Sequence, residues 1–413
     1  MQRYQPAANR PQKNAKQVAD ARTRWRDPIR YLWPLGIVAA AGPIIAWALA
    51  HSVSGVLWGF GGYLFVVMIP LADLATGTNT TAPPESRMGE VSNDKYYRWC
   101  TYIYVPVQYF GLFFGFWCLA YDQMTTGERA GLSITLGVSG AVAINVAHEL
   151  GHKKSRIERS LAKLALAQSF YGHFLIEHNV GHHVNVATPD DPASARFGES
   201  VWAFFPRAVF GGLASGIRLE SARLQRQGER FWGPHNNILH SWLTSLVIYG
   251  VILGVFGWRM LPWIALQAVL AVLVLEAVNY IEHYGLLRPL SANGRRTQIS
   301  SQHSWNGDHL CSNLFLFNLQ RHSDHHTYPR RRYQVLRSLD DAPQLPVGYA
   351  LMVLLSLAPP LWRRVMDPRV LAHYDGDLTK INIQPSRRDK IVRKYGPLSA
   401  SLDPDDGRGS SAD

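Results

Sequence analysis

The sequence contains few cysteines, and its long apolar runs contain almost no charge. Its 413 residues include three scattered cysteines, Cys100, Cys118 and Cys311, with no C-x-x-C spacing. We therefore expect neither a disulfide framework nor a thiolate site for zinc or an iron–sulfur cluster. No Gly-rich nucleotide fold and no Ser-His-Asp or Cys-His pair is recognisable. The first 30 residues are polar and basic and lack the short apolar core of a signal peptide, so the first apolar run should itself drive membrane insertion.

Basic residues are concentrated between the apolar runs. The formal net charge of +12 would suit a nucleic-acid-binding protein, but no basic motif with interleaved aromatic residues stands out from the loops. Loops that face anionic lipid explain the distribution better. The 13 Trp and 18 Tyr residues are also typical of a membrane protein with aromatic side chains at the interfaces.

Six apolar runs reach the length of about 20 residues that a helix needs to cross a bilayer. They cover approximately residues 31–50, 55–75, 99–121, 131–150, 241–258 and 261–281. This pattern predicts an all-α fold, in which a six-transmembrane-helix bundle carries a helical cytoplasmic cap. The run from Gly348 to Trp362 is short and contains Pro359 and Pro360. We expect it to form an interfacial or buried helix rather than a seventh span.

The distribution of Lys and Arg predicts the orientation of the chain. These residues are frequent before the first run, in the loop after the second and in the long insert after the fourth, and scarce in the other connections. Both termini are therefore expected on the cytoplasmic side. We divide the chain into a basic cytoplasmic N-terminal segment (1–30), a six-span membrane domain (31–283) with a cytoplasmic insert (151–240), a cytoplasmic cap with the last histidine cluster (284–395) and a polar disordered tail (396–413).

Nine of the 16 histidines lie in four clusters, in the polar stretches that follow long apolar runs. The clusters are His148 and His152; His178, His182 and His183; His283; and His322, His325 and His326. Imidazole is the commonest side-chain metal ligand near neutral pH, and nine imidazoles exceed the four ligands that a zinc ion usually takes. The pattern therefore predicts two metal ions held almost wholly by imidazole at one membrane face.

The spacings within the clusters indicate how the histidines are shared. The first two clusters each contain a pair of histidines at positions i and i+4, a spacing that places both side chains on one face of a helix. The second and fourth clusters each contain two adjacent histidines, which cannot point the same way. Each adjacent pair can therefore offer one nitrogen to each of two ions.

Carboxylate and amide side chains flank the clusters. A ligating imidazole usually donates its second N–H to such a group, so these side chains are candidates to orient the ligands. The candidates are Glu149, Asn279, Asp190 and Asp324, together with Glu177, Asp191 and Glu282. Asn279, one turn before His283, is also a candidate for a weak or water-mediated oxygen donor. The seven other histidines are expected to be structural, with His173 the first candidate for an exception.

Two further hypotheses stay open at this point. The string His148-Glu-Leu-Gly-His152 matches the H-E-x-x-H motif, in which two histidines bind zinc and the glutamate is the general base of a protease. That hypothesis leaves seven clustered histidines unexplained. A metal transporter would also bind metal, but its ligands should lie near mid-membrane at broken helices, whereas these follow helix ends on one face.

The clusters and their neighbours resemble those of integral-membrane alkane 1-monooxygenase, the non-haem di-iron alkane ω-hydroxylase of the wider membrane fatty-acid desaturase and hydroxylase superfamily. The similar strings are His148-Glu-Leu-Gly-His-Lys153, Glu177-His-Asn-Val-Gly-His-His183, Asn279-Tyr-Ile-Glu-His-Tyr-Gly285 and Leu319-Gln-Arg-His-Ser-Asp-His-His326. The similarity extends over roughly residues 30–375. Fatty-acyl desaturases typically have H-x-x-H-H as their second cluster. This chain has H-x-x-x-H-H, which favours the hydroxylase.

The resemblance implies that all nine clustered histidines bind two iron ions and that O₂ converts a medium-chain n-alkane into a 1-alkanol. It also implies electrons from rubredoxin, reduced by a flavin-dependent rubredoxin reductase, and a multi-pass protein of the bacterial inner membrane with a cytoplasmic active site. A fatty-acyl desaturase or hydroxylase of the superfamily is the alternative. We expect Trp58 or Phe65 to close the far end of an alkane cavity among the spans, and Arg330, Arg331 and Arg332 to attract an acidic electron donor.

Overall fold

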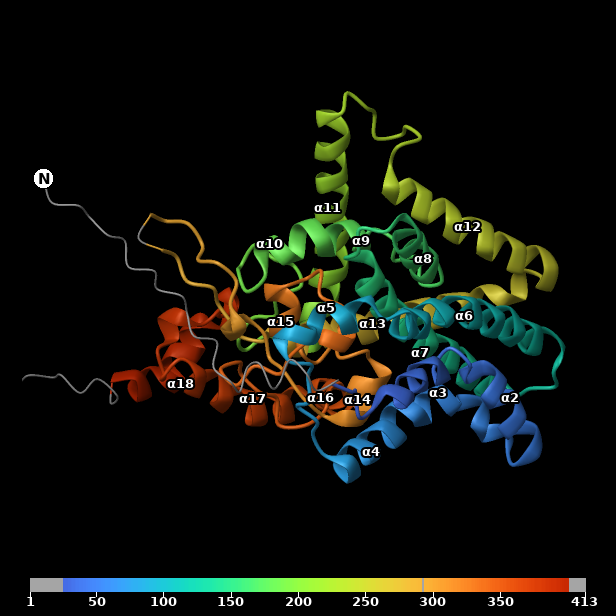
Figure 1. Ribbon diagram of the computed structural model, residues 1–413, viewed down its shortest axis with the longest axis horizontal. Coiled ribbons are helices and arrows are strands. Elements are labelled where there is room, and N and C mark those ends of the chain that lie inside the picture. The colour runs from blue at the N-terminus through green and yellow to red at the C-terminus, as the bar shows by residue number, and fades with distance from the viewer. Residues whose placement is uncertain (1–24, 292, 401–413) are drawn as a thin grey trace, which may run out of the picture.

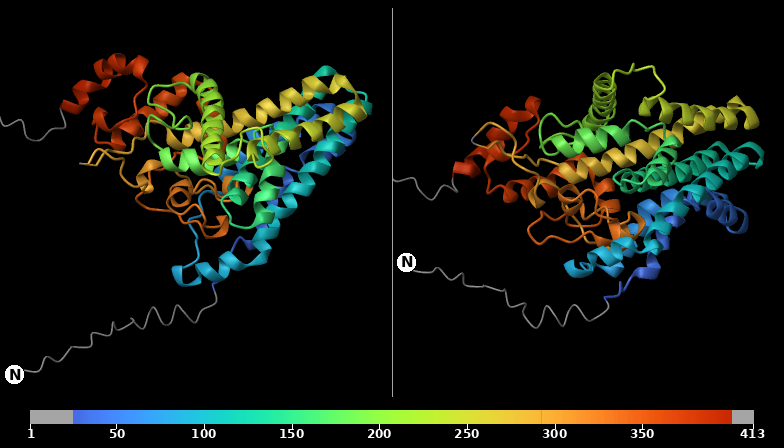
Figure 2. Two further views of the ribbon diagram at one scale, coloured as in Figure 1. Left: turned by 90° about the horizontal axis from the view of Figure 1, so that it is seen from above. Right: turned by 45° about the horizontal axis from the view of Figure 1, so that its top comes forward.

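The chain folds into a bundle of long helices with a cap of shorter helices at one end (Figure 1). The computed structural model describes residues 25–291 and 293–400. Within these ranges every regular element is a helix, and β pairing is limited to four isolated bridges. The long helices lie side by side from two further directions as well, with the cap at the same end (Figure 2). The prediction of an all-α fold is confirmed.

Five helical segments are long and apolar enough to cross a membrane, and a bent pair of helices is a sixth candidate. The five are Gly55–Thr76 (η2 Gly55–Gly59, α3 Phe60–Tyr63, η3 Leu64–Met68 and α4 Ile69–Thr76), α6 (Lys95–Tyr121), α7 (Thr126–Gly151), α12 (Asn237–Phe256) and Trp258–His283 (η6 Trp258–Met260 and α13 Leu261–His283). We refer to them as spans.

The first apolar run is bent rather than straight. It consists of η1 (Arg30–Val38) and α2 (Gly42–Ser52), which meet at an angle of 69°. Pro34 lies inside η1, which is a tight 3₁₀ helix, and Pro43 lies in the first turn of α2, where the missing N–H costs no hydrogen bond. The two prolines thus explain why this run forms two short helices.

Helix α7 lies at the centre of the bundle and packs closely against α13. A Cβ atom placed on Gly137 would lie 2.8 Å from a side-chain carbon of Leu270, and one on Gly140 would lie 3.0 Å from Ala271. Small residues at these positions let the two helices approach each other. Their final turns, which carry the first and third histidine clusters, are therefore brought together at the cap end.

Helix α8 (Arg156–Ala167) follows α7 and packs back along it, with further contacts to α6 and α12. The turn after it, at Gln168, is fully buried. Gln168 Nε2 donates to the carbonyl oxygen of Leu136, near the middle of α7, and Gln267 Nε2 donates to the carbonyl oxygen of Gln168 (3.0 Å). The glutamines satisfy backbone groups at a depth where lipid offers no partner. Part of the insert 151–240 thus packs among the spans and leads from there to the second cluster.

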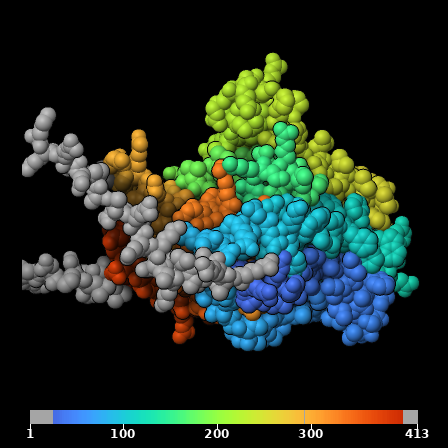
Figure 3. Space-filling view, viewed as in Figure 1, coloured from blue at the N-terminus to red at the C-terminus, as the bar shows by residue number. Residues whose placement is uncertain are grey.

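The cap is built from short helices and one long one. Its elements are α9 (Phe174–Ile176), η5 (Glu177–His182), α10 (His183–Asn185), α11 (Val201–Arg226), η7 (Ser301–His303), α14 (Leu310–Phe315), α15 (His322–Thr327), η8 (Tyr333–Val335), α16 (Tyr349–Ser356), α17 (Pro359–His373), η9 (Leu378–Lys380), η10 (Pro385–Arg387) and α18 (Arg388–Ala400). Two further short helices, η4 (Glu85–Arg87) and α5 (Met88–Asn93), lie between the span Gly55–Thr76 and α6. Helix α11 runs across the direction of the spans and projects from the body (Figure 1, Figure 3).

The run from Gly348 to Trp362 forms α16 and the start of α17, and α16 packs against α13. The prediction of a short helix rather than a seventh span is confirmed. Most of the expected N-terminal segment (1–24) and of the expected tail (401–413) lies outside the described residues, and α18 extends to Ala400.

Candidate metal centre

The four histidine clusters lie on separate elements and meet where the spans join the cap. The end of α7 supplies the first cluster, η5 and α10 the second, the last residue of α13 the third, and α15 the fourth. The side chains are buried except that of His152, which is partly exposed. Residues more than 170 positions apart are therefore in contact; for example, Nε2 of His148 lies 2.9 Å from Nε2 of His325.

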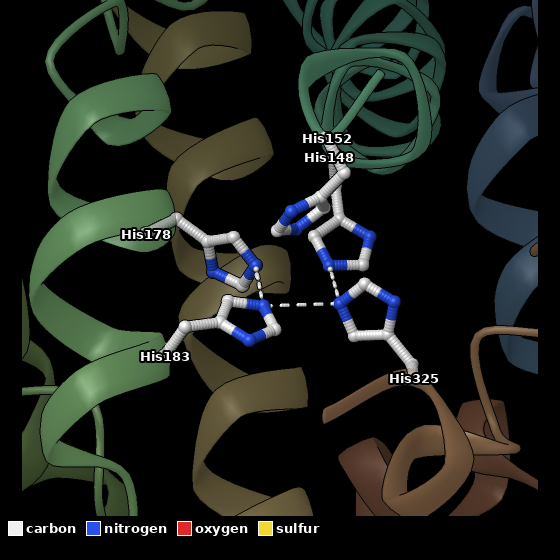
Figure 4. A group of neighbouring side chains, drawn as sticks. All are labelled: His148, His152, His178, His183 and His325. Carbon is white, nitrogen blue, oxygen red and sulfur yellow. Dashed lines mark hydrogen bonds between the residues drawn. The ribbon is translucent and has the colours of Figure 1, made fainter. Parts of the chain in front are cut away.

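The nine imidazoles form two groups. The five-histidine group contains His148, His152, His178, His183 and His325, and the four-histidine group contains His182, His283, His322 and His326. Within each group, one nitrogen from each ring lies within 4.8 Å of the others. Figure 4 shows the rings of the five-histidine group converging from α7, from the second cluster and from α15. In both adjacent pairs one histidine belongs to each group, the arrangement expected from their adjacency.

The second cluster differs from the expected helix geometry. His178 and His182, four residues apart, belong to different groups, whereas His178 and His183 share one, with their Nε2 atoms 3.1 Å apart. The reason is that η5 is a π-helix. Its hydrogen bonds run from residue i to i+5 instead of i+4, so its wider turn brings residues i and i+5 close together as well. The sequence pattern alone did not indicate which of His182 and His183 would share a group with His178.

In both groups, ring nitrogens of different histidines lie close together. There are too few N–H groups for every close pair of nitrogens to form a hydrogen bond. In the four-histidine group, Nε2 of His322 lies 2.9 Å from Nε2 of His326 and 3.3 Å from Nε2 of His283. Burial lowers the pKa of His322 and His326 well below the usual value, so these rings are neutral, and a neutral ring has one N–H and one lone pair.

In the five-histidine group, the buried Nε2 of His152 has no hydrogen-bond partner. Two nitrogens bound at about 2.1 Å to one ion, at right angles, would lie about 3 Å apart. The converging, largely unprotonated nitrogens therefore fit metal ions better than they fit a hydrogen-bonded network.

One carboxylate orients a clustered histidine from its outer side. Asp191 Oδ2 lies 2.9 Å from Nδ1 of His182 and also accepts from Oγ of Ser194 at 2.6 Å. Burial by itself would lower the pKa of His182, but the carboxylate outweighs burial and the pKa is raised. Because Nδ1–H is engaged with Asp191, the Nε2 lone pair is left pointing into the four-histidine group. The neighbouring candidate Asp190 is exposed, so Asp191 is the member of the pair that lies against a histidine.

The other flanking candidates have different partners. Glu149 is paired with Lys153, whose Nζ lies 3.0 Å from the carboxylate. Asp324 accepts from the guanidinium of Arg331 and from the backbone N–H of Arg337. These two carboxylates hold the segment after the fourth cluster, because Lys153 also donates to the carbonyl oxygen of Arg331 (2.6 Å). They stabilise the surroundings of the histidines without a direct contact to a ring.

A small polar cavity adjoins the histidines. It is lined by Tyr171, His173, Glu177, Glu276 and Asn279, among others. Asn279 Nδ2 donates to Glu276 (3.2 Å). Both ring nitrogens of His173 are buried without a hydrogen-bond partner, and burial lowers its pKa to about 4. His173 thus belongs to neither histidine group but lies beside them.

A larger cavity is almost wholly apolar and lies among the spans. It lies between η3, α4, α7, α13, α14 and α16. Its lining residues on η3, α4, α7 and α13 are Leu64, Phe65, Ile69, Val138, Ala141, Val142, Asn145, Val274, Leu275 and Val278. Asn145 and Val278 lie about one turn before His148 and His283, so the cavity runs along α7 and α13 towards the histidine groups. Phe65 lines it, as expected, whereas Trp58 is not among the lining residues.

A basic cleft lies on the other side of the five-histidine group. Its lining includes Arg98, His152, Lys154, Arg330 and Arg332. Lys154 and Arg330 are exposed. Arg332 is paired with the buried Glu158 (2.7 Å) and Arg331 with the buried Asp324. Of the three consecutive arginines singled out in the sequence, Arg330 is therefore the one whose charge faces solvent.

Comparisons with known proteins agree with this fold and site. The family model described as fatty acid desaturase matches residues 129–356, which contain all four clusters. The chain is 39% identical to the alkane 1-monooxygenase of Acinetobacter baylyi over 396 residues, which cover 94% of this chain and 97% of the relative. It is 41% identical to alkane 1-monooxygenase 1 of Alcanivorax borkumensis over 380 residues, 92% of this chain and 94% of the relative. The chain belongs to the fatty acid desaturase family and, within it, to the alkane 1-monooxygenases.

Proposed function

We propose that the protein hydroxylates the terminal carbon of medium-chain n-alkanes. In the balanced reaction, the alkane, O₂, two electrons and two protons give a 1-alkanol and water. The observation that carries the proposal is an apolar cavity among the spans, whose lining residues Asn145 and Val278 lie about one turn before His148 and His283 in the two groups of converging histidines. The names of the relatives, alkane 1-monooxygenases at about 40% identity over nearly the whole chain, support the same activity.

The cavity suits a hydrocarbon that enters from lipid. Its lining contains no charged side chain, and apolar burial stabilises a bound alkane by about 0.8 kcal/mol per CH₂. Since a methyl end offers no polar handle, the shape of the cavity must present the terminal carbon to the metal centre. The dry walls also keep water away from the reacting end of the substrate.

We propose that the nine histidines hold two iron ions, one in each group. When bound, the iron supplies the activation of O₂, which the protein's own side chains cannot perform. The neutral imidazoles present lone pairs, and Asp191 fixes the tautomer of His182. Asn145, whose Nδ2 donates to the carbonyl oxygen of Leu316 (2.7 Å), bounds the end of the cavity next to His148.

Electrons must come from another protein. We propose rubredoxin, reduced by its flavin-dependent reductase, as the donor, and the basic cleft as its docking surface. An acidic partner would be steered there by Lys154 and Arg330, and the partly exposed ring of His152 lines the same cleft. From the positive-inside rule we propose that this face and both termini lie in the cytoplasm. The bacterial relatives support spans in an inner membrane.

Desaturation of a fatty-acyl chain is the second candidate function, because the matching family model is that of the fatty acid desaturases. A free acyl substrate would carry a carboxylate, yet no Lys or Arg lines the described part of the apolar cavity. The hydrocarbon cavity therefore favours an unsubstituted alkane.

Detergent-purified protein tests the proposal directly. We expect about two irons per chain and O₂-dependent formation of 1-octanol from octane when reductase, rubredoxin and NADH are present. An alkene product from an acyl substrate would support the desaturase instead. One zinc ion per chain with peptide cleavage and no need for O₂ would revive the protease hypothesis.

A further inference from the structure

We propose that Glu282 supplies a carboxylate oxygen to the metal ion of the four-histidine group, so that each group offers five protein ligands. The inference rests on the proposed metal binding and assigns a ligand beyond the nine histidines. Glu282 lies in the last turn of α13, directly before His283.

Glu282 approaches the four-histidine group at one ring, that of His322. Oε2 of Glu282 lies 3.2 Å from Nε2 of His322. The same Nε2 atom lies 2.9 Å from His326 and 3.3 Å from His283. The carboxylate oxygen is therefore as close to His322 as the other ring nitrogens are, near the separation of about 3 Å expected between neighbouring ligands of one ion.

Glu282 otherwise lacks a charge partner. Glu282 is 1% exposed, and its Oε1 atom has no hydrogen bond of good geometry. The hydroxyl of Tyr349 is a neutral polar group beside the carboxylate. Among the described residues, its carboxylate forms an ion contact with His322 and with no Lys or Arg. An isolated buried carboxylate is costly unless it is paired or binds a metal. A cation in the four-histidine group would remove that cost.

The contrast with Asp191 separates a ligand from an orienting group. Asp191 meets His182 at Nδ1, on the outer side of the ring, and is further held by Ser194 and the N–H of Ala193. Glu282 meets His322 at Nε2, the atom that faces the other ligands. A carboxylate at the converging nitrogens cannot orient the ring from behind, so its position is that of a ligand.

Replacing Glu282 with Gln removes the charge at nearly constant volume. With ⁵⁷Fe-loaded full-length protein in detergent, the measurements are iron per chain, chelator competition and the Mössbauer spectrum. We expect one of the two irons to bind at least 100-fold more weakly in Glu282→Gln, with a change in one of two spectral components. Glu282→Asp, which keeps the carboxylate, should retain two irons with intermediate affinity.

Glu276→Gln is the matched control. Glu276 is a buried glutamate on the same helix, but it accepts from Tyr171 and Asn279 rather than facing a clustered histidine, so both irons should be retained. Two irons bound by Glu282→Gln with wild-type affinity and spectrum would overturn the assignment, while absence of iron from the wild-type protein would contradict the proposed function itself.

The stability of the metal-free protein separates a ligand from a structural residue. Without metal the carboxylate has no Lys or Arg partner among the described residues, so its charge does not stabilise the apo fold. Apo Glu282→Gln should therefore unfold at the wild-type temperature or above. A lower unfolding temperature of the apo variant, together with weaker binding of both irons, would instead show a structural role.

Discussion

The apolar cavity and the basic cleft lie on different sides of the same histidines and differ in nearly every property. The cavity is lined mainly by Leu, Val, Phe and Ala side chains, while the lining of the cleft includes Arg, Lys and His152. At the proposed metal centre, a hydrocarbon could thus approach through the apolar cavity and a charged protein from the aqueous side, without sharing a path. The comparison predicts that changes on one side alter substrate selection and changes on the other alter electron delivery.

Narrowing the cavity should have the largest effect. Ala141 lines it on α7, and Ala141→Phe would displace about three methylene units of substrate. The loss is about 2.4 kcal/mol, or roughly 50-fold in octane affinity, measured as kcat/KM for octane. Val269→Phe, at a position on α13 that is 56% exposed, is the control and should leave octane turnover unchanged. Equal losses in both variants would argue against this cavity as the substrate site.

Widening the cavity should shift the range of accepted chain lengths. Phe65 lines the cavity, whereas Trp58 lies further along the same span, its ring against that of His51 (centroids 5.6 Å apart). We expect Phe65→Ala to raise turnover of alkanes a few carbons longer, and Trp58→Ser to affect only the longest chains. Competition between alkanes of different length, analysed by gas chromatography, gives the profile. A profile that responds to Trp58→Ser alone would mean that Phe65 does not bound the substrate.

Removing positive charges from the basic cleft should have the smallest effect and should alter electron delivery alone. The double variant Lys154→Gln and Arg330→Gln is expected to lower rubredoxin-driven kcat/KM about three- to tenfold at low salt and to flatten its salt dependence. Turnover with a small chemical reductant should not change. Arg226→Gln, on the exposed end of α11, is the charge-matched control, and a salt response that survives in the double variant would move the docking surface elsewhere.

The sequence predicted the elements that depend on local pattern. Apolar runs of sufficient length became helices, and the histidine clusters that follow two of these runs met because both spans end at the cap. The assignment of His182 and His183 to different histidine groups also followed from the sequence, because adjacent side chains on a helix point in different directions. These inferences need only helix geometry and the solvent preference of the side chains.

What could not be predicted depends on contacts between distant segments. The sequence does not show that Asp191 rather than Asp190 turns inward, or that Arg331 and Arg332 are paired with Asp324 and Glu158. Both are decided by which segments the fold brings alongside. The 69° bend between η1 and α2 likewise depends both on the two prolines and on the segments against which the two helices pack.

The π-helical turn at the second cluster also bears on how this site varies between relatives. A cluster one residue shorter, H-x-x-H-H on an ordinary α-helix, would align its first and last histidines at i and i+4. Here the wider turn aligns His178 and His183 at i and i+5 and reaches the same convergence with one residue more. The π turn thus has the form of a tolerated single-residue insertion, so two motifs of different length can encode the same arrangement of ligands.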